Sequence, residues 1–287
     1  MEERELLDRF IDVAAKVRRE VPLVHSITNC VTVNDVANAT LAVGGTPAMA
    51  DNPEDVRDFV AIASCTNINM GKLDDQTIEA MVRAGKACNE LGVALMVDPL
   101  AGGVSAYRNA AIDRMLSETS PTVIRGNLSE MAYVAGRRVS TRGVDVSEAD
   151  AAAHDPVDIA VTVAREHGCI SAVTGAVDVV SDGKTVVKVA NGVPEMGRIT
   201  GSGCMLDGVI GAFIGVADIG DPVDVLVATT GAICSMGLAG ELALARLEKR
   251  NGRIGTGSFH IALIDELSLL DEDAYRAGAH LEVLQAD

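Results

Sequence analysis

Aromatic side chains are scarce in this chain. Its 287 residues include no tryptophan, four phenylalanines and three tyrosines. A core must therefore be built from aliphatic side chains, which is feasible because hydrophobic residues make up 48% of the sequence. The chain also lacks a linker rich in proline, glycine or serine and any block of like charge. We therefore expect residues 1–287 to form one soluble globular domain.

Basic charge is also in short supply, since the formal net charge is −17. A nucleic acid or an anionic membrane surface needs a basic face, so both are excluded as partners. Only six of the 24 basic residues are lysine, whereas aspartate supplies 24 of the 41 acidic residues. Such a surface holds hydration water well in high salt, and we hypothesise a halophilic source.

The six cysteines lie at wide spacings, with no C-x-x-C pair and no histidine at the spacing of a metal site. Most of them are therefore expected to be small core residues. The N-terminal segment is charged and amphipathic, unlike a signal peptide, and no uncharged apolar run reaches the roughly 18–20 residues of a membrane span. These features predict a cytoplasmic protein.

Amphipathic helical segments alternate with short, continuous apolar segments along the chain. The periodicity predicts helices over residues 2–19, 31–43, 54–63, 74–91, 128–135, 157–167 and 222–249, and strands over 23–27, 47–50, 67–70, 93–97, 122–124 and 169–173. This alternation predicts an α/β fold, with a mostly parallel central sheet covered by helices on both faces.

Three further segments complete the prediction. An Asp-Gly turn at 181–184 joins two apolar runs, 177–180 and 185–190, and predicts an antiparallel hairpin at the edge of the sheet. From Gly203 onward the chain is expected to be nearly all helix. The polar 140–156 segment is expected to be the most mobile loop.

A glycine-rich turn, Gly197 to Gly208, runs directly into an apolar helical segment. It is the centre of the candidate site, on which the other candidate residues are expected to converge. Such a turn presents free backbone N–H groups at a helix N-terminus, where the helix dipole favours an anion. Glycine also allows a phosphate to approach the main chain closely. We therefore expect a phosphate group to bind at this turn.

Polar residues follow directly after several predicted strands. They are Asn29, Asp98, Arg125 with Asn127, and Thr174, and Glu130 lies three residues beyond Asn127. In open α/β sheets, ligands bind beyond the carboxyl ends of the strands. We therefore expect these residues to converge with the glycine-rich turn on one edge of the sheet.

This set of residues suits phosphoryl transfer, which needs a metal held by carboxylates and donors for the phosphates. Asp98 and Glu130 could hold Mg²⁺, largely through water, and Arg125 could pair with phosphate oxygens. The amides of Gly201, Ser202, Gly203 and Cys204 could stabilise charge on the transferring group.

Each residue taken alone also has a purely structural explanation. Asp98 could cap a strand end, Glu130 could be a first-turn helix acid, and Cys204 and Met49 could be core residues. His25 is better explained as a half-buried histidine with its hydrogen bonds satisfied than as a base or ligand. The coincidence of position at several strand ends favours the functional explanation for the set.

The chain also resembles a known family, the hydroxyethylthiazole kinases of thiamine salvage, over nearly its whole length. Seven motifs in the same order carry the resemblance: 22–29, 34–38 with 44–50, 97–99, 124–127 with Glu130, 173–175, 200–204 and 255–259. The resemblance implies a ribokinase-like fold and ATP-dependent phosphorylation of the primary hydroxyl of 4-methyl-5-(2-hydroxyethyl)thiazole. It also implies Mg²⁺ and a homotrimer with thiazole pockets between subunits.

The same resemblance assigns roles to residues. Asn29 and Met49 are similar to thiazole-pocket residues, and Gly201 to a substrate contact in the anion-binding loop. Arg125 and Thr174, with Asn127, are similar to ATP contacts. Asp98 and Glu130 correspond to the metal and phosphate electrostatics. Cys204 stands where most ribokinase-like enzymes carry an aspartate base.

The sequence departs from the family pattern at three places. After Asp98-Pro99 the family has Val-Gly-Ala-Gly-Ala-Thr, whereas residues 100–105 here are Leu-Ala-Gly-Gly-Val-Ser. This difference puts the shape of that loop in question. Cys30 replaces a frequent aromatic, which could enlarge the pocket and broaden the substrate range. Ser202 replaces a common threonine, a mild change.

Other functions remain open at this point. A ribokinase-like kinase for pyridoxal or hydroxymethylpyrimidine is the nearest alternative, followed by an ATP- or ADP-dependent dehydratase that repairs hydrated nicotinamide cofactors. Both normally carry aspartate where Cys204 stands. A non-catalytic nucleotide-binding regulator is a third alternative, but binding alone would not require Asp98, Glu130 and Arg125 together.

Overall fold

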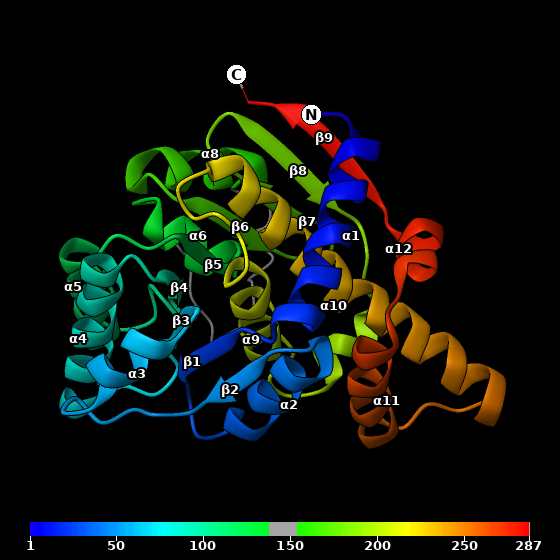
Figure 1. Cartoon of the computed structure of the whole chain (residues 1–287), viewed down its shortest axis with the longest axis horizontal. Helices are drawn as coiled ribbons and strands as arrows, with labels where there is room; N and C mark the ends of the chain where they lie inside the picture. Colours follow the sequence, from blue (N-terminus) through cyan, green and yellow to red (C-terminus); the bar gives the residue numbers. More distant parts are fainter. Residues whose placement is uncertain (138–153, 287) are drawn as a thin grey trace.

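The computed structural model of the chain describes residues 1–137 and 154–286. A nine-stranded sheet runs through the molecule in the order β2-β1-β3-β4-β5-β6-β7-β8-β9 (Figure 1). Neighbouring strands are parallel from β2 through β1, β3, β4 and β5 to β6. Strand β7 then pairs antiparallel with β6, β8 with β7, and β9 with β8. The predicted α/β class, with a mostly parallel sheet and an antiparallel edge, is confirmed.

The strands are short and mostly buried. Their bounds are β1 Leu23–Ile27, β2 Thr46–Ala48, β3 Cys65–Asn69, β4 Ala94–Asp98, β5 Val123–Asn127, β6 Ile170–Thr174, β7 Asp178–Ser181, β8 Thr185–Val189 and β9 Leu281–Gln285.

Helices connect the strands and dominate the C-terminal third. Their bounds are α1 Glu3–Glu20, α2 Val33–Val43, α3 Val56–Ile62, α4 Asp75–Leu91, α5 Ala106–Glu118, α6 Leu128–Val134, α8 Pro156–His167, α9 Ser202–Ile214, α10 Pro222–Asn251, α11 Thr256–Leu269 and α12 Glu272–Gly278, with a 3-10 helix at Pro194–Arg198.

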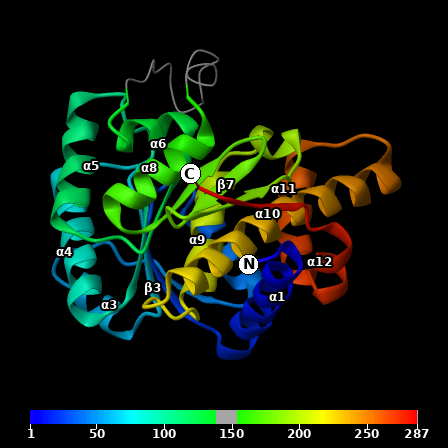
Figure 2. The ribbon, with the colours of Figure 1, turned by 90° about the horizontal axis from the view of Figure 1, so that it is seen from above.

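Helices cover both faces of the sheet, as Figure 2 shows. On one face, α3, α4 and α5 pack against Ile68 and Leu95, and α6 and α8 pack against Ile124. On the other face, α1, α9 and α10 pack against Val123 and Ala172. Because side chains alternate along a strand, each strand contributes to both cores. The face under α9 and α10 is the one that carries the polar site.

Local sequence signals explain several element boundaries. The Asp221 side chain accepts a hydrogen bond from the Val223 amide at the start of α10, and Pro222 occupies its first turn, as predicted. In the predicted hairpin, Asp182 accepts hydrogen bonds from two amides of its own turn, and Gly183 has φ +85°. Strands β7 and β8 therefore meet where the sequence predicts.

Two elements differ from the prediction. The chain after Gly203 is mostly helix, in line with the prediction, but Leu281–Gln285 forms an unpredicted strand, β9, which pairs with β8 at the edge of the sheet. Helix α5 was not predicted, since its first half, AYRNAAID, has few strongly apolar residues. Nearly all of the predicted 140–156 loop lies outside the described residues.

Helix α10 is long and apolar enough to span a membrane by length and composition, yet 89% of its most apolar window is buried inside the protein. It packs against α1, α9 and α11 and against β6 and β7. Within the described residues, its apolar surface is therefore accounted for as the core helix of a globular domain.

Candidate active site

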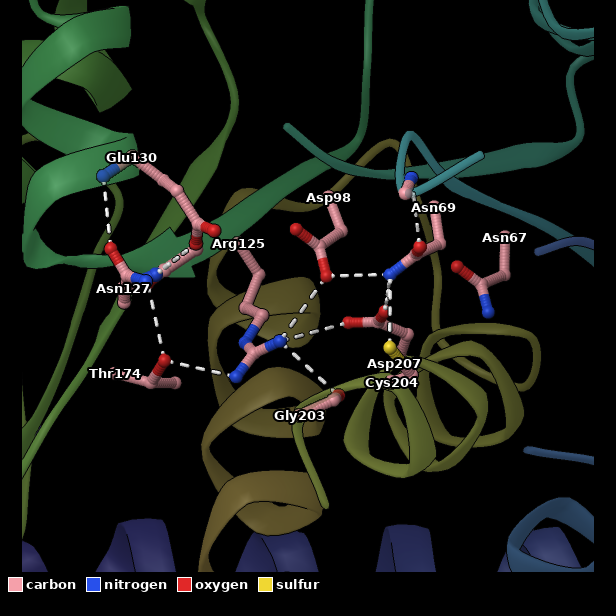
Figure 3. A network of polar contacts seen from close by, with 12 residues as sticks. Asn67, Asn69, Asp98, Arg125, Asn127, Glu130, Thr174, Gly203, Cys204 and Asp207 are labelled. Carbon is pink, nitrogen blue, oxygen red and sulfur yellow. Dashed lines mark hydrogen bonds and ion pairs between the residues drawn. The ribbon is translucent and has the colours of Figure 1, made fainter. Parts of the chain in front are cut away.

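The predicted strand-end residues converge at the carboxyl edge of the parallel strands, beside the start of α9 (Figure 3). Asp98 ends β4, Arg125 lies in β5 and Thr174 ends β6. Alternation along each strand places them on the same face as Met96, Val123 and Ala172, which belong to the core under α9 and α10. The sheet therefore brings these polar side chains under the N-terminus of α9.

Arg125 is the hub of a buried ionic network. Its Nη1 lies 3.4 Å from an oxygen of Asp98 and 3.3 Å from an oxygen of Asp207. Nη1 also donates to the Gly203 carbonyl at 3.2 Å, and Nη2 donates to the Thr174 hydroxyl at 2.9 Å. The guanidinium is thus held by four groups, and glycine at 203 lets it pack closely against α9, because a Cβ there would lie 3.1 Å from Nη1, a crowded contact.

Two asparagines connect this network to Cys204. The Asn69 amide donates to Asp98 at 2.8 Å and to Asp207 at 2.9 Å, and lies 3.4 Å from the Cys204 sulfur. The Asn29 amide is also 3.4 Å from that sulfur. Asn29 and Cys204 are therefore in contact, and both lie at the same edge of the sheet as Asp98.

The first turn of α9 is an open set of backbone donors. In the described part of the chain, the amides of Ser202, Gly203 and Cys204 donate to no protein group. Gly201, which precedes the helix, has φ +82°, and a Cβ there would lie 2.5 Å from Thr32. Only glycine fits at this position. The predicted geometry of an anion-binding helix N-terminus is present.

Glu130 ties two loops of the site together. Its Oε2 accepts from the Asn127 amide at 2.7 Å, while the Asn127 side chain accepts from the Glu130 amide, forming a capping box at the start of α6. Its Oε1 accepts from the Ala101 amide at 2.8 Å. Glu130 thus fixes the 99–104 loop that follows Asp98.

The loop in which residues 100–105 depart from the family pattern contains one non-glycine residue with a positive φ. Ala101 has φ +59°, in the left-handed region that glycine adopts at least cost. We expect Ala101→Gly to raise the free energy of unfolding by about 0.5–1 kcal/mol, because relief of the left-handed conformation outweighs the extra entropy of glycine in the unfolded chain. Denaturant unfolding measures this change.

Ala63→Gly is the matched control, because Ala63 has φ −81° and gains nothing from glycine. It should lower the free energy of unfolding by roughly 0.5–1 kcal/mol. Equal losses in both variants would contradict the assignment of strain to Ala101.

The ionisation of the site reflects an excess of buried carboxyl groups. Burial and then the charge of Asp207 raise the pKa of Asp98, against the opposing effect of Arg125. Burial likewise raises the pKa of Asp207, and burial followed by the charge of Asp98 raises the pKa of Glu130 to about 7. Burial alone would lower the pKa of Arg125, but Asp207 and Asp98 outweigh it and raise the value. Arg125 therefore stays charged.

Cys204 is neutral at physiological pH in this environment. Burial, followed by the charges of Asp207 and Asp98, raises the pKa of its thiol to about 11. The thiolate is the reactive form of cysteine, and nearby carboxylates disfavour it. The side chain therefore acts through its position and its hydrogen bonds.

A cavity of about 560 Å³ opens beside the network. Arg125, Asn127, Thr174 and the first residues of α9, Ser202 and Gly203, line one end, and apolar side chains of α10 and of the 193–196 segment line the other. The predicted ATP contacts therefore share one cavity.

Met49 lies apart from that cavity. It follows β2 at the opposite edge of the sheet and is half-buried. His25 has satisfied hydrogen bonds, as predicted, but it is fully buried and not half-buried: its Nε2 pairs with the Ala50 carbonyl at 2.8 Å and its ring stacks on Phe59.

Sequence reasoning missed Asp207 and Asn69. Asp207 lies three residues after Cys204 and is fully buried in an otherwise apolar helix. A carboxylate at such a position is costly unless it is paired, so its helical spacing from Cys204 was a usable signal. Asn69 gave a weaker signal, because asparagine is also common in turns that follow strands.

A ribokinase-like α/β fold, with free amides at a helix N-terminus close to a buried arginine and carboxylates, is the arrangement expected of a phosphotransferase. The sequence profile of the hydroxyethylthiazole kinase family matches residues 14–273. A hydroxyethylthiazole kinase from Ruminiclostridium cellulolyticum is 44% identical over 267 residues, which cover 93% of this chain and 94% of the relative.

Solved structures agree with this assignment. The structure of a hydroxyethylthiazole kinase protein from Pyrococcus horikoshii OT3 superimposes with a TM-score of 0.83 at 34% identity, covering 96% of this chain and 98% of that one. An ADP/ATP-dependent NAD(P)H-hydrate dehydratase from Bacillus subtilis, 12% identical with a TM-score of 0.54, covers 87% of this chain and 90% of its own, and shares the fold alone. The chain belongs to the hydroxyethylthiazole kinase family.

Proposed function

We propose that this protein transfers the terminal phosphoryl group of ATP to the primary hydroxyl of 4-methyl-5-(2-hydroxyethyl)thiazole, in thiamine biosynthesis or salvage. The observation that carries the proposal is the set of free amides at Ser202, Gly203 and Cys204, next to the buried Arg125, which donates to the Gly203 carbonyl, and beside a cavity large enough for a nucleotide. Family membership supplies the substrate.

In this proposal the protein works mainly by position and by electrostatics. The α9 amides and Arg125 stabilise the negative charge of the transferring phosphoryl group, and Thr174 holds the guanidinium in place. Asn29 and Cys204 hold the thiazole alcohol at the other side of the amides. Because these groups are ordered in advance, little reorganisation is needed when the substrates meet.

The carboxyl groups suit Mg²⁺. Asp98 Oδ1 is buried and has no hydrogen-bond partner within the described residues, whereas both oxygens of Glu130 already accept backbone amides. No three acidic, cysteine or histidine side chains of the described ranges stand close enough to cage an ion. We infer that Asp98 and Glu130 hold the ion largely through water and ATP, as Mg²⁺ prefers. When bound, Mg²⁺ would neutralise charge on the phosphates.

Cys204 contributes to the reaction without being indispensable, because a neutral thiol is a poor general base. We expect Cys204→Ala to retain turnover, with kcat lowered by less than about a hundredfold, whereas loss of an essential base costs about 10²- to 10⁴-fold. Steady-state kinetics at saturating thiazole and Mg-ATP measure this difference.

Cys169→Ala serves as the control, since Cys169 is buried in the core under α6 and α8. It should leave kcat unchanged. Complete inactivity of a folded Cys204→Ala protein would show that the thiol is the essential base and overturn its assignment as a positioning group.

The active form in this proposal is a homotrimer. Val31 beside Asn29, Leu41 of α2 and Ile261 of α11 expose 55–69% of their surface, and α2 packs against α11. Burying these side chains against another copy would also bring a neighbouring subunit near Asn29. Light scattering in solution tests this state: a monomer that remains active at all concentrations would exclude it.

We further propose a cytoplasmic location and a halophilic source. All six cysteines are free thiols, which suits a reducing compartment. The acidic, lysine-poor composition suits molar salt. Cell fractionation tests the first point. Unfolding followed over a KCl series tests the second, because stability that stays flat or falls towards molar salt would contradict it.

Mass spectrometry of the product tests the proposed reaction directly. The protein, the thiazole alcohol and Mg-ATP should yield the thiazole phosphate and ADP in equal amounts. ADP formed without a phosphorylated thiazole would exclude the transfer and leave only nucleotide hydrolysis.

A further inference from the structure

One acidic residue of the cavity has no part in the network around Arg125. Asp178 begins β7, is half-buried and lines the same cavity as Arg125 and Thr174. The alternation of β7 places it on the face of Val180, which belongs to the core under α9 and α10. Its side chain therefore lies on the cavity side of the sheet.

Asp178 is connected through the chain and the sheet to both groups of residues that line this cavity, the polar group around Arg125 and the apolar group. It follows the Thr174 end by four residues through the Gly175 turn, and the charge of Arg125 still reaches it. On its other side it pairs with Val189, two residues before Asn191, at the start of the segment that forms the apolar end. A nucleotide with its phosphates at Arg125 and its base at the apolar end would bring its ribose past Asp178.

The Asp178 carboxyl group retains a free acceptor. Its Oδ1 accepts the Gly175 amide at 2.9 Å, and within the described ranges the other oxygen has no hydrogen-bond or ion-pair partner. Burial raises the pKa of Asp178 to about 6, partly offset by the hydrogen bond from the Gly175 amide and by the charge of Arg125, so the group is mainly a carboxylate at neutral pH. An acceptor with no protein donor needs hydroxyl or amide donors from a ligand or water.

The other polar side chain in this part of the cavity is already engaged. The Asn191 amide donates to Glu241 and to the Gly278 carbonyl, and its oxygen accepts the His280 amide at 2.9 Å. The apolar end beyond it is formed by Met196, Ile233 and Met236. Of these two side chains, Asp178 is therefore the one with capacity left to recognise a polar part of the ligand.

We propose that Asp178 binds the ribose hydroxyls of the nucleotide donor and makes the enzyme prefer ribonucleotides over deoxyribonucleotides. A carboxylate accepts two vicinal hydroxyl donors well, the chemistry by which an acidic residue binds ribose in dinucleotide-binding folds. The base is held by apolar contact. This inference rests on the proposed function in one respect, that a nucleotide occupies the cavity.

The first test uses the wild-type protein and needs no variant. Calorimetry should show ADP binding about tenfold or more tightly than 2′-deoxy-ADP or 3′-deoxy-ADP, the range expected for a hydrogen bond to a charged group. Equal affinity for all three nucleotides would overturn the proposal. Because binding is measured without thiazole, this result is independent of the acceptor substrate.

The second test compares Asp178→Ala with Asp182→Ala, which changes a half-buried aspartate in the turn of the same hairpin. Asp178→Ala should weaken ADP binding about tenfold or more, weaken 2′-deoxy-ADP binding less, because only its 3′-hydroxyl contact is lost, and bring the two affinities closer together, whereas Asp182→Ala should keep the wild-type ratio. Equal weakening of both nucleotides would mean that Asp178 only supports the Gly175 turn, and would overturn the proposal.

Kinetic measurements of thiazole phosphorylation, made beside the binding measurements, separate this inference from the proposed function. Wild-type protein that binds ADP selectively but does not phosphorylate the thiazole would refute the thiazole kinase and leave the ribose contact standing. Wild-type protein that phosphorylates the thiazole equally well with ATP and 2′-deoxy-ATP would support the thiazole kinase and refute the ribose contact of Asp178.

Discussion

Asp98→Asn is expected to lower kcat by about a hundred- to a thousandfold while the protein keeps its fold. An asparagine oxygen can still accept from Asn69 and Arg125, as Asp98 Oδ2 does at 2.8 and 3.4 Å. The change replaces the unpartnered Oδ1 by an NH₂ group, which repels a cation. Steady-state kinetics and the Mg²⁺ dependence of thermal stability in the presence of ADP measure the two consequences.

The control for this variant is Asp58→Asn, at an exposed aspartate of α3 far from the site. It should retain wild-type kinetics. Adding Glu130→Ala to Asp98→Ala should abolish turnover, since both carboxyl groups proposed for the metal are then gone. A folded double variant with near-normal kcat would refute the metal assignment.

Arg125→Met is expected to damage both stability and catalysis. Removing the guanidinium leaves Asp98 and Asp207 buried without their counter-ion, and breaking a buried pair in this way costs about 3–5 kcal/mol. The same change removes the cation that faces the phosphate-binding amides, so kcat/KM for ATP should fall by at least about a hundredfold. Denaturant unfolding and initial-rate kinetics measure the two effects.

A second variant separates these two roles. In Arg125→Met with Asp207→Asn, one buried acid is neutralised, so part of the lost stability should return while kcat/KM stays low. Arg57→Met, at an exposed surface ion pair, should change neither quantity appreciably. Recovery of activity together with stability would show that Arg125 acts only through the fold.

Much of the sheet was predictable because its signals are local. Strands β4, β5 and β6 are short apolar runs between amphipathic helices, and each boundary falls within a few residues of its prediction. The convergence of Asp98, Arg125 and Thr174 then follows from topology, since the ends of parallel strands share one edge. This part of the site needed no knowledge of side-chain packing.

The elements that were missed depend on longer-range contacts. Strand β9 is formed by Leu281–Gln285, which carries no strong strand pattern of its own and is stabilised by pairing with β8. Secondary structure of this kind is decided by tertiary context and not by local propensity.

The role of Asp207 could not be derived from strand ends, because the residue belongs to a helix. Its carboxylate enters the site only because α9 crosses the sheet with Cys204 and Asp207 on the face towards Asn69. A buried acid in an apolar helix was visible in the sequence, and so was Arg125, but the pairing of the two was not. The ionic network is therefore a property of the packed structure.

The central claim, a thiazole kinase, is tested most directly by one assay. ADP release is measured with hydroxyethylthiazole, pyridoxal and hydroxymethylpyrimidine side by side, in high KCl with Mg-ATP. We predict turnover with the thiazole and little or none with the other two alcohols. No release with the thiazole, together with turnover of pyridoxal or the pyrimidine, would contradict this account.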